Sequence, residues 1–84
     1  YPIDEKFRAF NFHVIDVADG NDMEQLRQAF AEARSTKGMP TAIIAHTVKG
    51  KGVSFMENDI LWHYRTPQGE EYDAALAELE AQRP

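Results

Sequence analysis

Apolar runs and helical patterns alternate along the first half of the chain. The runs 12–19 (FHVIDVAD) and 41–47 (TAIIAHT) are mostly apolar, which is typical of strands covered on both faces by helices. Between them, apolar side chains recur at spacings of three and four, which predicts a helix with one apolar face. These side chains are Met23, Leu26, Phe30 and Ala33. A strand, a helix and a strand in this order predict a parallel βαβ unit with a right-handed crossover.

Turn signals set the limits of this central helix. The segment 19–22, Asp-Gly-Asn-Asp, predicts a turn, with Asp22 as the N-cap and Gln25 completing a capping box. Three helix-stopping residues then predict an end after about Arg34. They are Thr36, Gly38 and Pro40.

Two further helices are predicted, one near each end of the chain. Residues 4–10 form a short helix candidate, and residues 70–81 form an amphipathic one. Their apolar positions are Phe7 and Phe10 in the first helix and Tyr72, Leu76 and Leu79 in the last.

A glycine-rich and polar loop, residues 48–69, follows the second strand and is expected to be flexible. It begins with Lys49-Gly50-Lys51-Gly52, where the rule for open parallel sheets places ligands, outside the carboxyl ends of the strands. Two glycines let the backbone approach an anion, and a lysine supplies charge to a phosphate oxygen. The turn is not a Walker loop, because it lacks the spacing to Gly-Lys-Ser/Thr. From these residues alone, a merely solvated turn stays open.

Composition limits what the chain can be. It has 84 residues, 43% of them hydrophobic, a formal net charge of −5 and no cysteine. A sheet covered on both faces needs more strands and helices than this length supplies, so residues 1–84 are expected to be a single partial domain. The chain starts without methionine, which indicates a processed product or a segment of a longer protein.

The charge and hydropathy exclude several classes of function. An acidic balance argues against a general nucleic-acid binder, because phosphate binding needs surplus lysine and arginine on one face. No apolar run approaches the ~20 residues of a membrane span. The default expectation is a cytoplasmic protein with neither nucleic acid nor membrane as partner.

The pair Trp62-His63 is the second candidate feature of the loop, and His63 lies fourteen residues after Lys49. A histidine changes its charge state near neutral pH, so it can share a proton with a phosphate or a substrate hydroxyl. It can equally be a packing residue beside Trp62, and the residues alone leave both interpretations open.

The run TVKGKGVSFMEN followed by WH resembles the end of the thiamine-diphosphate-binding domain of transketolases, in which a Lys-Gly-x-Gly turn precedes a Trp-His pair at the same interval. The resemblance covers nearly the whole chain and is best with the short N-terminal subunits of two-gene transketolases. It implies a three-layer α/β/α domain of which this chain is the C-terminal portion. It also implies transfer of a two-carbon ketol unit from a ketose donor to an aldose acceptor.

Carried over residue by residue, the resemblance implies that Lys49 and Gly50 face the diphosphate of the cofactor. It implies that His63 contacts both the diphosphate and the sugar and acts as the catalytic acid–base group. The Mg²⁺ ligands of the family, a Gly-Asp-Gly segment and a downstream asparagine, are absent here and are expected outside this chain, so no metal ligand is assigned.

The resemblance also implies partners. These are the upstream half of the cofactor domain, a pyrimidine-domain partner chain or C-terminal subunit, sugar or sugar-phosphate substrates, and assembly as a dimer or α₂β₂. The chain departs from the family at Tyr64, where many members have glycine, and at Asn21, where many have histidine. Two other functions stay open: an enzyme like 1-deoxyxylulose-5-phosphate synthase or another sugar-modifying split transketolase, and a noncatalytic α/β interaction module with a phosphate-binding Lys-Gly-Lys-Gly turn.

Overall fold

The computed structural model describes residues 2–84 and confirms the α/β class. Its elements, in chain order, are α1 (Ile3–Ala9), β1 (His13–Val17), α2 (Met23–Ser35), β2 (Thr41–Ala45), the 3₁₀ helix η1 (Ile60–His63) and α3 (Glu70–Ala81). They fall into two compact units, one ending at Thr47 and the other spanning Val48–Pro84. The prediction of a single partial domain stays a prediction.

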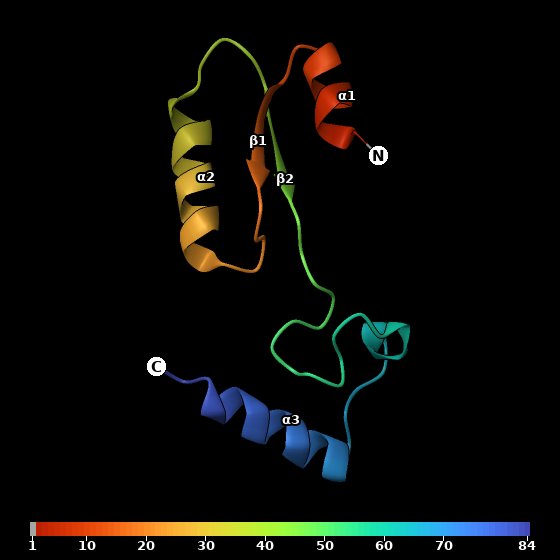
Figure 1. Ribbon diagram of the computed structural model, residues 1–84. Coiled ribbons are helices and arrows are strands. Elements are labelled where there is room, and N and C mark those ends of the chain that lie inside the picture. The colour runs from red at the N-terminus through yellow and green to blue at the C-terminus, as the bar shows by residue number, and fades with distance from the viewer. Residues whose placement is uncertain (1) are drawn as a thin grey trace. The chain divides into compact units, whose positions relative to one another are not determined.

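The first unit contains the predicted parallel βαβ arrangement. Strands β1 and β2 pair in parallel, with His13 opposite Thr41 and Val17 opposite Ala45. Helix α2 lies on one side of the two strands and α1 on the other (Figure 1), which gives this unit three layers. The strands therefore have helical cover on both sides, as their continuous apolar runs predicted.

The core of this unit lies between β1 and α2. Ile15, Val17 and Ala29 are buried, with further apolar side chains packed around them. The surrounding residues are Leu26, Ala33 and Ile43. The core-facing positions of α2 are thus 26, 29 and 33.

The predicted apolar face of α2 was therefore partly wrong. Met23 is 72% exposed and Phe30 is 53% exposed. Successive helix positions are about 100° apart, so Phe30 turns away when its neighbour Ala29 faces the strand. The small side chain of Ala29 lets the helix backbone approach the sheet closely, and periodicity alone did not distinguish this alanine from its larger neighbours.

The start of α2 confirms the predicted N-cap and corrects the capping box. The carboxylate of Asp22 accepts a hydrogen bond from the Glu24 N–H at 3.0 Å. The side chain of Gln25 accepts from the N–H of Asp19, also at 3.0 Å, instead of from that of Asp22. The Asp22 N–H already donates to the carbonyl oxygen of Asp19 at 3.1 Å. Gln25 therefore accepts from the N–H of Asp19, because that of Asp22 already has a partner.

The second unit consists of successive turns, η1 and α3. The bounds of α3 agree with the predicted helix at 70–81, but its apolar side chains are only half covered within this unit. Tyr72, Leu76 and Leu79 are 54%, 46% and 49% exposed, while Ala75 is buried. Over residues 2–84, no helix has both the length and the apolar character needed to cross a bilayer.

Candidate functional site

The Lys-Gly-Lys-Gly turn belongs to a closed loop at the start of the second unit. The N–H of Asn58 donates to the carbonyl oxygen of Lys49 at 2.8 Å, which joins the two ends of segment 49–58. Inside the loop, the Val53 N–H donates to the Gly50 carbonyl at 3.3 Å. The lysines are therefore presented on a loop with a defined backbone.

Gly50 is required by the chain's own packing in this loop. Its φ is +74°, a conformation that glycine adopts without strain. A Cβ added here would lie 2.4 Å from the carbonyl oxygen of Met56. The expectation that this missing Cβ clears space for an anion needs correction, because Met56 occupies that direction. A contact between the Gly50 backbone and a cofactor stays a prediction.

Lys49 and Lys51 both have exposed side chains. In the described part of the chain, neither ammonium group takes part in an ion pair or a side-chain hydrogen bond. Glu78 of the same unit has a different partner, because it accepts from the N–H and hydroxyl of Ser54 at 2.9 and 3.0 Å. The lysine charges are available to an external anion.

Helix η1 carries the Trp-His pair, and the prediction of a structureless loop at 48–69 missed it. Asp59 caps the helix by accepting from the Leu61 N–H at 3.0 Å. Trp62 is half-buried and lies edge-to-face against Phe55, with ring centroids 5.4 Å apart. His63 is exposed, and its ring stands at 89° to that of Tyr64 with centroids 6.1 Å apart.

Arg65 supplies two contacts that the sequence pattern did not reveal. Its guanidinium carbon lies 5.2 Å from the centroid of the Trp62 ring. Its Nη2 donates to both carboxylate oxygens of Glu71, at 3.1 and 3.3 Å. The two residues are six apart, in the segment after η1 and in the first turn of α3, and this spacing is neither helical nor that of a strand, so no periodic signal could have identified the pair.

The structure places Lys49 and His63 in the same compact unit, both exposed. Among the described residues, no hydrogen bond or ion pair joins them. Residues 2–84 also contain no group of three or more histidine, aspartate or glutamate side chains arranged to hold a metal ion. The two candidate residues are therefore separate groups that an external ligand would have to connect.

The other two histidines have partners in the first unit. Nε2 of His46, the residue that follows β2, lies 2.6 Å from Asp16 Oδ1. Nε2 of His13 lies 2.7 Å from Glu32 Oε2. Both imidazoles are occupied by carboxylates of their own unit, unlike that of His63.

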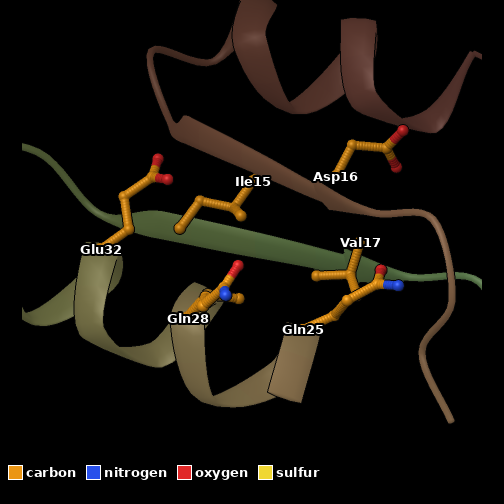
Figure 2. A pocket seen from close by; sticks show the side chains of 7 residues that line it. Ile15, Asp16, Val17, Gln25, Gln28 and Glu32 are labelled. Atoms are coloured by element: carbon orange, nitrogen blue, oxygen red, sulfur yellow. The ribbon is translucent and has the colours of Figure 1, made fainter. Parts of the chain in front are cut away.

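A small cleft in the first unit lies apart from the predicted site residues. It has a volume of about 210 Å³ and lies between β1 and α2 (Figure 2). Gln25, Gln28 and Glu32 of α2 and three consecutive residues of β1, Ile15 to Val17, contribute to its wall. Neither Lys49 nor His63 belongs to this cleft.

Comparison with known proteins gives a family match over most of the chain. The family described as "Transketolase, thiamine diphosphate binding domain" matches residues 2–79. This span includes the loop of Lys49 and Gly50, helix η1 with His63, and most of α3.

Characterised relatives agree with this match. The chain is 38% identical over 79 residues to the 6-deoxy-6-sulfo-D-fructose transketolase subunit SqwG of Clostridium sp. (strain MSTE9), covering 94% of this chain and 28% of that protein. It is 36% identical to an apulose-4-phosphate transketolase subunit of Phocaeicola vulgatus, covering 89% of this chain and 26% of that protein. It is 41% identical to the human transketolase-like protein 2, covering 79% of this chain and 10% of that protein. The chain thus spans about a quarter of the length of the two bacterial relatives.

Proposed function

Because the chain belongs to the transketolase family, through its thiamine-diphosphate-binding domain, we propose that the protein containing it transfers a two-carbon ketol unit from a ketose donor to an aldose acceptor. The proposal depends on one observation: two residues of the family motif have exposed side chains in this structure. Lys49 and His63 both lie within the matched span, in one unit, with side chains open to a ligand.

Lys49 is the proposed partner of the cofactor's diphosphate. Its ammonium group has no ion pair among the described residues, and the hydrogen bond from Asn58 fixes its backbone. A positive charge at a glycine-containing turn fits an anionic diphosphate. The cofactor, when bound, supplies the nucleophilic carbon for ketol transfer. Lys49 contributes charge and orientation, and Gly50 permits the turn that presents it.

His63 is the proposed acid–base group. Its imidazole is exposed and, within the described residues, makes no hydrogen bond. It is therefore available to hold or release a proton at a hydroxyl oxygen of the sugar while a neighbouring carbon–carbon bond breaks. In its protonated form it also stabilises negative charge that develops on that oxygen.

The remaining parts of the site are proposed to come from outside these 84 residues. Mg²⁺ would accompany the diphosphate, held by residues of the upstream half of the cofactor domain. A pyrimidine-domain chain or C-terminal subunit would complete the site in a cytoplasmic dimer or α₂β₂ assembly. The support is that two relatives with short chains are named as transketolase subunits. Their names also favour sugars, including sugar phosphates, as the substrate class.

The test of His63 uses the intact protein with its partner chain. His63→Ala should lower ketol transfer by about 10²-fold or more, because a positioned acid–base group contributes that much. The matched control is His13→Gln, which changes a histidine already bonded to Glu32 and should leave turnover unchanged. Turnover would be measured by release of the shortened aldose from a panel of ketose donors. Equal turnover in His63→Ala and the unsubstituted protein would contradict the role of His63.

The test of Lys49 is a direct binding measurement. Lys49→Ala in the intact protein should weaken thiamine diphosphate binding by about tenfold or more, since a charge-assisted contact is lost. Lys51→Ala removes a second exposed, unpaired lysine of the same turn and serves as the control. Calorimetric titration at fixed Mg²⁺ gives both dissociation constants. If both substitutions weakened thiamine diphosphate binding equally, Lys49 would contribute only general positive charge, and its specific contact with the diphosphate would be contradicted.

The noncatalytic module predicts a different result in the same experiments. Thiamine diphosphate would then produce neither a heat of binding nor a thermal shift of the intact protein at any Mg²⁺ concentration. That outcome would reject the transketolase proposal as a whole.

A further inference from the structure

His63 lacks a local anchor of its own. Within residues 2–84 its imidazole makes no hydrogen bond, and it lies at the last position of a four-residue 3₁₀ helix. Such short helices have poor hydrogen-bond geometry and depend on their surroundings. Apart from the ring contact with the neighbouring Tyr64, the direction of the His63 side chain is therefore set by what holds the backbone of η1.

Trp62 is the residue that attaches this helix to the rest of its unit. It is half-buried, whereas Ile60 and Leu61 are 75% and 44% exposed. Its ring forms a T-shaped pair with that of Phe55, with centroids 5.4 Å apart. Arg65 covers a face of the ring at 5.2 Å. Trp62 precedes His63 directly in η1, so a displacement of the helix backbone at Trp62 would also move His63.

Arg65 is in turn held by α3. Its Nη2 donates to both carboxylate oxygens of Glu71, at 3.1 and 3.3 Å. The pair is 47% and 38% exposed, and ion pairs this open contribute little to stability. What the pair does supply is geometry: a planar guanidinium, fixed at one end by Glu71, is laid against the ring of Trp62.

We propose that Arg65 and Glu71 are positioning residues for the ketol-transfer reaction, which hold Trp62 and thereby orient His63. This inference rests on the proposed function, because it needs His63 to act on the substrate. In this proposal Arg65 acts through Trp62, because the two groups that it binds are the ring of Trp62 and the carboxylate of Glu71. The Trp62–Arg65–Glu71 cluster forms part of the wall of a hollow of about 450 Å³, through Trp62 and Glu71.

The experiment is a set of variants in the intact protein with its partner chain. Arg65→Met keeps a long side chain and removes the charge, and Glu71→Gln removes only the ion pair. Each should lower kcat about fivefold to tenfold and leave the KM of the sugar unchanged, because a misaligned His63 would transfer its proton more slowly. Arg65→Lys should recover part of the loss. The matched control is Arg83→Met, which breaks the exposed Arg83–Glu80 pair of the same unit, at 3.2 Å, and should change nothing.

The decisive measurement repeats Arg65→Met in a His63→Ala background. If Arg65 acts only through His63, the second substitution causes no further loss of kcat. An equal loss in both backgrounds would assign Arg65 a general structural role and overturn the inference. A raised KM for the sugar at unchanged kcat would assign it a direct substrate contact, with the same consequence.

A second readout does not depend on turnover. Subtracting the fluorescence of a Trp62→Phe protein isolates the emission of Trp62 from that of other tryptophans in the intact protein. Arg65→Met and Glu71→Gln should both increase quenching of this emission by acrylamide, because the cover over the ring is released; Arg83→Met should not. Unchanged quenching would overturn the inference.

The two proposals fail in different ways. A His63→Ala protein that is as active as the unsubstituted one contradicts the role of His63 and, with it, the proposed function of this site. A large loss in His63→Ala together with full activity in Arg65→Met and Glu71→Gln contradicts only the positioning role.

Discussion

Gly38 and Gly50 show two different reasons why a position in a chain needs glycine. Both have positive φ, +87° and +74°. A Cβ at Gly38 would meet no atom within 4 Å, whereas one at Gly50 would lie 2.4 Å from the carbonyl oxygen of Met56. Gly38 is needed only for its backbone conformation, whereas Gly50 is also needed because there is no room for a side chain. The loop that presents Lys49 therefore depends on Gly50 for both its conformation and its packing.

Gly50→Ala should open the loop, and Gly38→Ala should not. Alanine at positive φ costs about 1–2 kcal/mol at either site. At Gly50, displacement of Met56 adds about 1–3 kcal/mol of overpacking strain. Hydrogen exchange of the Asn58 amide, which is bonded to the Lys49 carbonyl, measures this opening in the intact protein. Faster exchange in Gly38→Ala than in Gly50→Ala would contradict the packing account.

Local sequence determines some features of the helices well and others poorly. The bounds of α3 and the cap of α2 were predictable, because helix periodicity and capping act over a few residues. The exposure of Phe30 and the existence of η1 were not, since both depend on packing against distant parts of the chain. The candidate site divides in the same way: resemblance identified His63, whereas the contacts of Arg65 required the structure.

The cap of α2 provides a test at the level of a single helix. Asp22→Ala should destabilise the start of α2 by about 1 kcal/mol, because the Glu24 N–H loses its acceptor. Asp22→Asn keeps an acceptor oxygen and should be close to neutral. Hydrogen exchange of the first-turn amides of α2 reports the difference. If both substitutions accelerated exchange equally, the negative charge at the helix N-terminus, and not the hydrogen bond, would be the stabilising factor.

Neither unit has a large core of its own. The buried apolar residues described are Ile15, Val17 and Ala29 in the first unit, and Val53 and Ala75 in the second. The sheet comprises β1 and β2 among the described residues, so each strand has an edge without a partner there. Two-stranded sheets are marginally stable in water, and open edges favour further pairing. The chain also spans about a quarter of its bacterial relatives, and we expect additional strands of the intact protein to cover these edges.

If the 84 residues are part of a larger domain, the isolated polypeptide should not bind the cofactor, and binding should require the intact protein with its partner chain. Titrated with thiamine diphosphate and Mg²⁺, the isolated polypeptide should show no heat of binding, whereas the intact protein with its partner chain should bind. The physical reason is that Lys49, in its proposed role, would supply only one charge to the diphosphate, while residues 2–84 offer no cluster of metal-binding side chains to hold the accompanying cation. Hydrogen exchange at β1 and β2 serves as the control for folding, because protected strands exclude an unfolded polypeptide as the cause. Binding by a folded, isolated polypeptide would show that the Lys49 loop is sufficient, and would contradict the placement of the Mg²⁺ ligands in the upstream half of the domain.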